Sequence, residues 1–321
     1  MATSSVPAFK ENPLLRLFCS IFLLGYCLTA HAMYGLQPKQ VANNTWVLEG
    51  STDNFSNENG GNIVNIAFIV TDVEVILIDS GPSFAYGREL ATAIAKITDK
   101  PVGRILLTHH HPDHMLGSQA FPGARIAALA ETAQLMQDEG DAMAENMYRM
   151  VGDRMRGTEV VMPDTLLEAG MLELDNYRLQ LLQLRGHTNA DLAVFDPQTG
   201  VLFAGDLVFY QRAVSTAHTP SIATWLEDIE TLAALPWKVI IPGHGPVARN
   251  DAPLQQMRDY LGWLDQLLTT AAAQGDDMNN IMRTPIPKRF ADINLTEYEL
   301  VRTVNHLYPA YEKAYWQQLS E

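Results

Sequence analysis

Short apolar runs alternate with helical stripes along most of the chain. Strand-like runs rich in Val, Ile and Phe lie at 45–49, 63–71, 73–79, 104–107, 124–129, 172–184, 192–195, 200–203 and 238–241. Apolar residues at helical spacing predict helices over 86–97 and 130–155. This mixed order of strands and helices predicts a β-rich α/β fold.

From Ala252 onward the pattern is helical. Leu254, Leu261 and Leu264 recur at helical spacing, and 296–316 is a last amphipathic stretch that is rich in Tyr. Such stripes normally pack on a core. The segment could also form one wall of a substrate pocket or a docking surface for a partner.

The N-terminus has the pattern of an export signal. Lys10 and Arg16 precede an apolar run over 17–30, and the small-residue pattern Ala30-His31-Ala32 follows it. We expect cleavage near Ala32 and a mature protein that is periplasmic or secreted. Retention as an anchor is the alternative, although the run is shorter than the roughly 20 residues of a membrane-spanning helix.

Composition narrows the possible partners. The 321 residues are 47% hydrophobic and carry a formal charge of −15, which fits a large globular protein with an ample core. The negative charge disfavours binding to nucleic acid and makes nuclease activity the weakest option. Small molecules or protein partners are expected instead. Both cysteines, Cys19 and Cys27, lie in the signal segment, so a Cys-ligated metal is excluded from the mature chain.

The segment 108–114, Thr-His-His-His-Pro-Asp-His, concentrates possible metal ligands directly after a strand-like run. Imidazole and carboxylate groups suit Zn²⁺ and its first-row neighbours. Continued strand alternation would turn His110 away from its neighbours, so we expect a structural or supporting role for it. The segment therefore predicts a metal site built around His109, His111, Asp113 and His114.

Three further ligand-capable residues share one sequence context. His187 follows the strand-like run that ends at Leu184, Asp206 follows the run over 201–204, and His244 follows the run over 238–241. Each lies beside a glycine, where the backbone can turn tightly. A single histidine in such a place is usually a hydrogen-bonded structural residue. Four such elements in order favour one shared metal site.

This ordered set resembles the metallo-β-lactamase superfamily over about Thr45 to Val247. The resemblance implies a four-layer αβ/βα sandwich with a metal site at one edge and a C-terminal helical extension. Position by position, it also implies a first metal on His109, His111 and His187, a second on Asp113, His114 and His244, and Asp206 as the bridge. The implied organisation is a signal peptide over 1–32, a metallo-β-lactamase-like domain over 33–250 and a helical segment over 251–321.

An aspartate at the bridging position looks like the glyoxalase II and lactonase branches of that superfamily. The implied cofactors are two divalent metal ions, with zinc expected and manganese or iron as alternatives. Two metals about 3.5–4 Å apart share a water and lower its pKa. The resemblance thus implies hydrolysis of an ester, thioester, lactone or amide, β-lactams included, by a bridging hydroxide that the ligand Asp113 helps to orient.

Several segments narrow the resemblance further. The export signal, Trp46-Val-Leu-Glu-Gly, Asn59-Gly-Gly-Asn-Ile and Ile241-Pro-Gly-His-Gly-Pro look like the SoxH-related quinoprotein relay system zinc metallohydrolases. Those exported proteins are associated with dehydrogenases that use pyrroloquinoline quinone, which implies a periplasmic quinoprotein as a possible partner. The alternative function is a quinoprotein maturation or relay factor with little general hydrolase activity. The sequence leaves the oligomeric state open.

Three residues and one loop each allow two interpretations, one functional and one structural. Asp79 ends the third strand-like run and could orient a ligand imidazole or cap the following turn. Tyr210 and His218 follow the bridging Asp206 in the chain and could contact substrate or be solvated loop residues. The polar loop 50–61 could overhang the site or simply join two strands.

Overall fold

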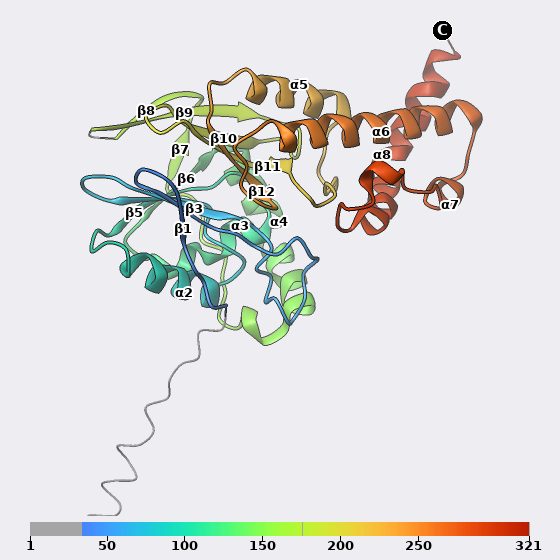
Figure 1. Ribbon diagram of the computed structural model, residues 1–321. Helices are drawn as coiled ribbons and strands as arrows, with labels where there is room; N and C mark the ends of the chain where they lie inside the picture. Colours follow the sequence, from blue (N-terminus) through green and yellow to red (C-terminus); the bar gives the residue numbers. More distant parts are fainter. Residues whose placement is uncertain (1–33, 175, 321) are drawn as a thin grey trace, which may run out of the picture. The chain divides into compact units, whose positions relative to one another are not determined.

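Two β-sheets form the centre of the computed structural model, which describes residues 34–174 and 176–320 (Figure 1). The first sheet has seven strands in sequence order from β1 to β7. Strands β1 to β4 pair antiparallel, and β4 to β7 pair parallel. Its strands are β1 (Lys39–Ala42), β2 (Thr45–Leu48), β3 (Ile66–Val70), β4 (Val75–Ile78), β5 (Val102–Leu106), β6 (Arg125–Leu129) and β7 (Thr165–Leu167).

The second sheet has five strands in the order β12-β11-β10-β9-β8. Strands β8 to β11 pair antiparallel, and β12 adds to β11 in parallel. Its strands are β8 (Gly170–Leu174), β9 (Tyr177–Leu184), β10 (Asp191–Asp196), β11 (Val201–Phe209) and β12 (Val239–His244).

Alternate residues of the central strands fill two separate cores. In β4, Ile76 and Ile78 belong to the core between the two sheets, whereas Val75 and Leu77 belong to the core on the outer face of the first sheet. Because both faces of such strands are buried, their sequences are continuous apolar runs and do not alternate with polar residues.

Helices cover the outer face of each sheet. α2 (Phe84–Ala95) and α4 (Ala130–Val151) contribute to the outer core of the first sheet. α5 (Ile222–Ala233), α6 (Ala252–Gln274) and α8 (Thr296–Gln318) contribute to the outer core of the second sheet. The order is therefore helix, sheet, sheet, helix (Figure 1), which confirms the predicted fold class. The predicted boundaries at residues 33, 250 and 251 stay predictions.

Local signals explain where the longer helices begin and end. The Ser83 hydroxyl accepts a hydrogen bond from the N–H of Tyr86 and caps α2, and Ser221 caps α5 in the same way. α6 ends at Gly275, whose φ of +71° suits glycine. The short helices are α3 (Pro112–Met115), α7 (Met278–Ile281) and the 3₁₀ turns η1 (Leu116–Ala120), η2 (Gly152–Met155) and η3 (Lys288–Phe290).

Two sequence-based expectations about strand ends were wrong. β11 continues to Phe209, so Asp206 lies inside the strand and not after it; the pairing of β11 with β12 shifts register at Gly205, which has a φ of +52°. β5 ends at Leu106, and irregular backbone carries the chain from there to α3. Strand alternation therefore does not determine the direction of His110.

Two strands and one long helix had no counterpart in the sequence-based prediction, β1, β7 and α5, and neither did the short helical turns α3 and η1. The strands are short and lie at the two edges of the first sheet, where little apolar patterning is needed. The predicted signal segment and its alternative as an anchor lie outside the described residues. Within residues 34–174 and 176–320, no helix is both long enough and apolar enough to cross a membrane.

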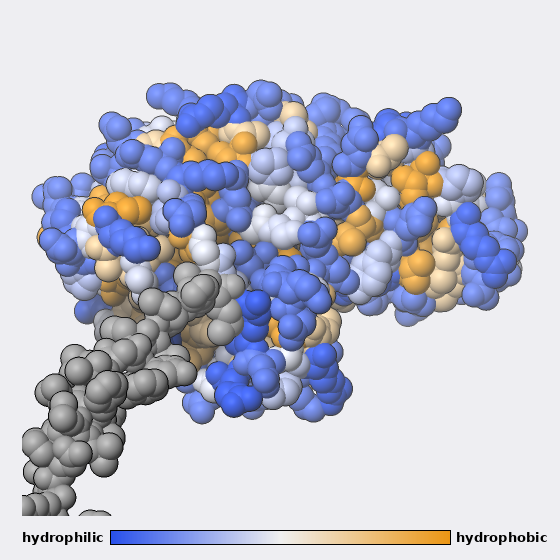
Figure 2. Space-filling view, turned by 60° about the horizontal axis from the view of Figure 1, so that its bottom comes forward, coloured by the Kyte–Doolittle hydropathy of each residue, from blue (hydrophilic) through white to orange (hydrophobic). Residues whose placement is uncertain are grey.

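Hydrophilic residues dominate the face of the molecule shown in Figure 2, and apolar residues form separate patches on it. Large apolar side chains that are more than half exposed include Val73 between β3 and β4, Leu166 on β7, and Trp316 and Leu319 at the end of α8. Scattered exposed apolar residues of this kind are ordinary on a folded surface.

Candidate metal centre

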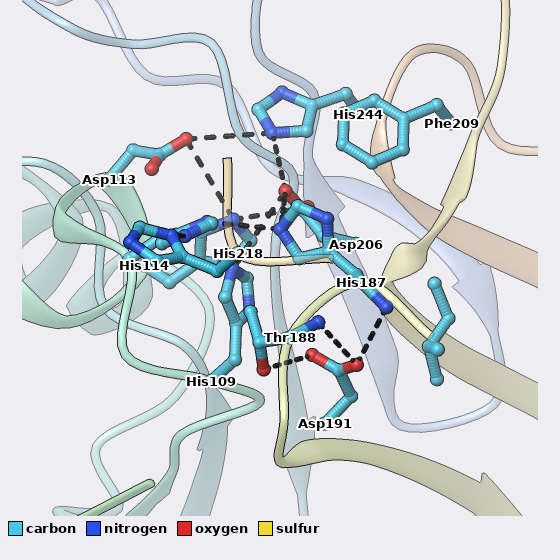
Figure 3. A network of polar contacts seen from close by, with 12 residues as sticks. His109, Asp113, His114, His187, Thr188, Asp191, Asp206, Phe209, His218 and His244 are labelled. Atoms are coloured by element: carbon cyan, nitrogen blue, oxygen red, sulfur yellow. Dashed lines mark hydrogen bonds and ion pairs between the residues drawn. The ribbon is translucent and has the colours of Figure 1, made fainter. Parts of the chain in front are cut away.

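The predicted ligands from four segments of the chain meet at one edge of the two sheets. β5 leads into the irregular segment that carries His109 and His111, and β9 leads into the turn that carries His187. Asp206 comes from β11 and His244 from the last position of β12, two strands that pair in parallel. Figure 3 shows the side chains of His109, His187, Asp206 and His244 pointing toward one another.

The first group consists of His109, His111, His187 and Asp206. One ligand atom from each lies within 4.8 Å of the others, and all four residues are buried. His111 Nδ1 lies 3.0 Å from His187 Nε2, and His187 Nε2 lies 3.3 Å from Asp206 Oδ2.

The second group consists of Asp113, His114 and His244, which are also buried and meet the same distance limit. His244 Nε2 lies 3.5 Å from Asp113 Oδ2 and 3.2 Å from Asp206 Oδ2. His114 Nε2 lies 3.2 Å from Asp206 Oδ1. Asp206 therefore touches both groups, one carboxylate oxygen facing His114 and the other facing His187 and His244.

These distances fit metal binding. Two atoms that each lie about 2.0–2.1 Å from one tetrahedral zinc are about 3.3–3.4 Å apart, close to the spacing of the facing atoms here. His109 Nε2 is fully buried and makes no hydrogen bond with any described residue, which is costly unless a cation binds it. The residues therefore fit two divalent metal ions, with Asp206 positioned between the groups.

Two glycines allow β12 and the residue after it to lie close to β11 and Tyr210. A Cβ atom at Gly243 would lie 2.0 Å from Asp206 Oδ1, and a Cβ atom at Gly245, whose φ is +94°, would lie 1.7 Å from the carbonyl oxygen of Tyr210. His244 is held between them: its Nδ1 donates to the carbonyl of Ile63 at 2.7 Å, which leaves Nε2 facing the centre.

Asp79 holds His114 from behind. Its Oδ2 lies 2.8 Å from His114 Nδ1 and also accepts a hydrogen bond from the Thr108 hydroxyl at 2.8 Å, while its Oδ1 accepts one from the Thr108 N–H at 2.8 Å. This pairing places the proton of His114 on Nδ1 and directs Nε2 toward Asp206. Of the two roles expected for Asp79, the geometry supports the orientation of a ligand imidazole.

Asp191 holds the turn that carries His187, a role that the sequence analysis missed. Its carboxylate accepts from the N–H groups of His187 and Thr188 and from the Thr188 hydroxyl, at 2.7–2.9 Å (Figure 3). The available signal was local: an aspartate four residues after a histidine and three after a threonine is typical of a side chain that closes a turn on backbone N–H groups.

The protein's own groups set the charge of the centre. Burial lowers the pKa of His109 well below its ordinary value, and it lowers the pKa of His187 to about 3. Burial opposes protonation of His114 too, but the carboxylates of Asp206, Asp79 and Asp113 outweigh it and raise the His114 pKa well above its ordinary value. Burial disfavours the Asp206 anion, yet His244 and His114 overcome this and lower its pKa.

The two predicted substrate contacts differ in their placement. His218 lies at the centre: its Nδ1 is 2.7 Å from His111 Nε2, and its side chain is about one-third exposed. Tyr210 is not among the described residues that line the pocket, and its N–H donates to the carbonyl of His244. His110 is buried beside His218, with ring centroids 5.0 Å apart, and its Nε2 lies 3.6 Å from Glu139 Oε2.

A pocket of about 250 Å³ opens at the centre. Four of the candidate ligands line it together with loop and helix residues: Asn54, Phe55, Ile63, His111, Pro112, Asp113, Met143, Asn146, Met150, Asp206, Arg212, Ser215, Ala217, His218, His244, Tyr298 and Arg302. Loop 50–61 thus both joins β2 to β3 and borders the pocket. The C-terminal helix α8 packs against α6 and also forms a pocket wall.

The pocket contains two guanidinium groups that no sequence pattern predicted. Arg212 is buried, and Arg302 lies on α8; both approach Oε1 of the buried Glu299, at 3.7 and 3.6 Å. One carboxylate therefore faces two positive charges. No sequence pattern links residue 212 to residue 302, because only tertiary packing brings α8 to the site.

An α/β sandwich with paired His/Asp groups at the edge of its sheets defines a class of metal-binding proteins. The family model for the metallo-beta-lactamase superfamily matches residues 59–244, more than half of the chain. The chain belongs to the metallo-β-lactamase superfamily and is a hydrolase of that superfamily with candidate metal-binding groups.

Named relatives agree with this assignment. A hydroxyacylglutathione hydrolase from Albidiferax ferrireducens is 31% identical over 137 residues, which cover 41% of this chain and 44% of that protein. A type 2 metallo-beta-lactamase from Bacillus sp. strain 170 is 23% identical over 259 residues, which cover 74% of this chain and 94% of that protein. The chain thus spans less than half of the first relative and nearly all of the second.

Solved structures support the fold. A metallo-beta-lactamase from Pontibacter korlensis superposes with a TM-score of 0.57 at 22% identity, covering 71% of this chain and 99% of that one. At this level of identity, the likeness shows a shared fold and says nothing about substrate.

Proposed function

We propose that this protein is an exported hydrolase that uses two divalent metal ions to cleave an ester, thioester, lactone or amide. The observation that carries the proposal is the position of Asp206, which faces ligand atoms of both groups at 3.2–3.3 Å. A structural metal site is closed by protein ligands around one ion. A carboxylate shared by two groups at the wall of a pocket is better suited to catalysis.

When bound, two metal ions supply an activated water and polarise the scissile carbonyl. The protein's residues do the remaining work. His109, His111 and His187 hold one ion, and Asp113, His114 and His244 hold the other. Asp206 and Asp113 add two negative charges, which partly offset the charge of the ions in a buried place.

The pocket favours a substrate that carries a negatively charged group near the reacting carbonyl. Apart from the metal ligands, Arg212 and Arg302 bring two positive charges to the pocket wall, and the single carboxylate of Glu299 offsets one of them. In a chain with a formal charge of −15, this local excess is favourable for an anion. The hydroxyacylglutathione hydrolase among the relatives makes glutathione thioesters the first substrates to test.

The test is a substrate panel with the zinc-loaded full chain. The panel pairs thioesters, lactones, β-lactams and phosphodiesters with analogues that lack a carboxylate, and Asp206→Ala serves as the inactive control. We expect turnover of an acyl substrate and a preference for its anionic form. Absence of turnover across the panel, in protein shown to hold two metals, would contradict the proposed reaction.

We propose further that the protein is exported and serves a periplasmic quinoprotein system. The export-signal pattern over 1–32 and the likeness to quinoprotein relay system hydrolases support this setting. Mass spectrometry of the full chain made in a Gram-negative host tests export, with a periplasmic protein beginning at Met33 as the expected product. An intact N-terminus would favour the anchor instead.

The alternative role, as a quinoprotein maturation or relay factor, gives a different result. In that case the zinc-loaded chain hydrolyses nothing in the panel. It does bind a quinone-dependent dehydrogenase specifically in periplasmic extract, and the Asp206→Ala variant does not bind that dehydrogenase. Turnover of an acyl substrate without such binding would exclude this role.

A further inference from the structure

The two ring nitrogens of His111 have different neighbours. Nδ1 lies 3.0 Å from His187 Nε2, inside the first group of ligands. Nε2 points the other way and lies 2.7 Å from Nδ1 of His218. His111 thus presents Nδ1 to a metal. In most metal-binding histidines the second ring nitrogen contacts a carboxylate or a carbonyl, whereas in His111 it contacts another histidine.

The proton positions follow from this arrangement. A neutral imidazole that binds metal through Nδ1 must carry its proton on Nε2. At 2.7 Å, His218 Nδ1 must then be the acceptor of that proton, so His218 carries its own proton on Nε2.

Glu139 lies beside this last nitrogen. Its Oε2 is 3.3 Å from His218 Nε2 and 3.6 Å from His110 Nε2, and its side chain comes from α4, while His218 comes from the loop after β11. His111 Nε2–H therefore donates to His218, and the Glu139 carboxylate is within ion-pair distance of the far side of the His218 ring.

We propose that Glu139 and His218 are positioning residues that hold His111 in its metal-binding tautomer and orientation, as a carboxylate–histidine–histidine relay behind the first metal. The inference rests on the proposed metal-binding role of His111. Hydrogen bonds that orient a ligand imidazole also make it a better donor to the ion. His218 thereby has a role other than the direct substrate contact expected from the sequence.

A metal ion bound by His218 itself is the competing explanation, since His110, His111 and His218 form a third group of possible ligands. Such an ion on His218 Nε2 would move the proton of His218 to Nδ1. Two N–H groups would then face each other across the 2.7 Å contact, unless His111 lost its Nε2 proton as well. The proton count therefore favours the relay over a third ion.

The test measures zinc affinity by competition with a chromophoric chelator, for each of the two ions, in His218→Ala, Glu139→Gln and the double variant. We expect the affinity for the ion held by the first group to fall about 10–100-fold in His218→Ala and about 10-fold in Glu139→Gln. If Glu139 acts only through His218, Glu139→Gln will change the affinity less than twofold when His218 is already alanine. The affinity of the second group should stay within about threefold of wild type.

Three further variants serve as controls. His218→Asn retains an acceptor near the position of Nδ1 and should recover part of the lost affinity. Glu145→Gln removes an exposed carboxylate on the same helix, and His306→Ala removes an exposed histidine on α8. Neither of the last two should change zinc binding.

Nitrogen NMR of the imidazoles in the zinc-loaded protein gives a second readout. We expect protons on Nε2 of both His111 and His218, and a proton on His218 Nδ1 would overturn the relay. In the affinity measurements, a third zinc ion that is lost in Glu139→Gln, additive effects in the double variant or unchanged affinities would each overturn it too. Both readouts need no substrate. A chain that binds two ions with the expected couplings but hydrolyses nothing would refute the proposed reaction and leave the relay intact.

Discussion

Replacement of Asp79 by Asn tests how the fold controls the second group of ligands. Asp79 accepts three hydrogen bonds of 2.8 Å, one on Oδ1 from Thr108 N–H and two on Oδ2 from the Thr108 hydroxyl and His114 Nδ1. An amide has one acceptor oxygen, so in either orientation its NH₂ group faces at least one donor. Asp79 has a φ of +59°, which asparagine tolerates well, so the backbone should be preserved.

The expected effect is a selective loss of metal affinity. Partners that orient a ligand imidazole typically contribute 10–100-fold, so Asp79→Asn should weaken zinc binding to the second group by about that factor, or about 1.4–2.7 kcal/mol. The affinity of the first group should change less, because Asp79 reaches that group only through the Thr108 hydroxyl, which lies 3.0 Å from His109 Nδ1. Chelator competition followed for each ion separately measures both values.

Asp196→Asn is the matched control. Asp196 is fully buried and accepts hydrogen bonds from Tyr177 and Thr199, on the part of β10 remote from the centre. Its replacement should lower the free energy of unfolding by about 1.5–3 kcal/mol and leave zinc affinity unchanged. The role of Asp79 in orienting His114 is refuted if Asp79→Asn binds both ions like wild type, or if both variants weaken zinc binding equally.

Three further predictions concern packing, protons and metal removal. Gly243→Ala places a Cβ atom 2.0 Å from Asp206 Oδ1 and should abolish binding of at least one ion. The control Gly262→Ala has open space around the new methyl group, so it should bind both ions and be at least as stable as wild type. Metal analysis measures the number of bound ions, and thermal unfolding measures stability. The raised pKa of His114 means that its ion pairs stabilise the metal-free fold fully below the unfolded pKa of about 6.5, and that this stabilisation is lost as pH rises through the raised pKa. Zinc binding to the second group at pH 7 should therefore release a proton, seen as a buffer-dependent heat in calorimetry, while binding to the first group should release none, since burial already keeps His109 and His187 neutral. Removal of zinc with a chelator should lower the free energy of unfolding by about 2.7 kcal/mol for each ion removed, relative to protein at a free zinc concentration of 100 times that site's Kd. Equal stability with and without zinc would contradict a buried metal centre.

The sequence determined most of the strands, the class of fold and the set of ligand-capable residues. Continuous apolar runs such as the one that contains β4 must be buried on both faces, so a layered sandwich follows from them. Regular order of histidine and aspartate beside glycine likewise marked the candidate centre. These signals are local, since each depends on residues that lie next to one another in the chain.

Tertiary structure decided which partners support the centre. Asp79 and His114 meet because β4 and β5 pair in parallel and end together. His218 reaches Glu139 because a loop from the second sheet lies against α4 of the first. Arg302, nearly a hundred residues after Asp206 in the chain, enters the pocket only because α8 packs against α6 and against the loop after β11.

Hydrophobic periodicity and ligand chemistry are properties of neighbouring residues, so they can be recognised in the sequence. A hydrogen bond or an ion pair between distant residues depends on how their segments are positioned in the folded protein. No periodicity in the chain encodes the 2.7 Å contact between His111 and His218. The sequence therefore supplied the groups that could hold the metals. Only the packing of the two sheets and their helices decided how those groups are oriented and what surrounds them.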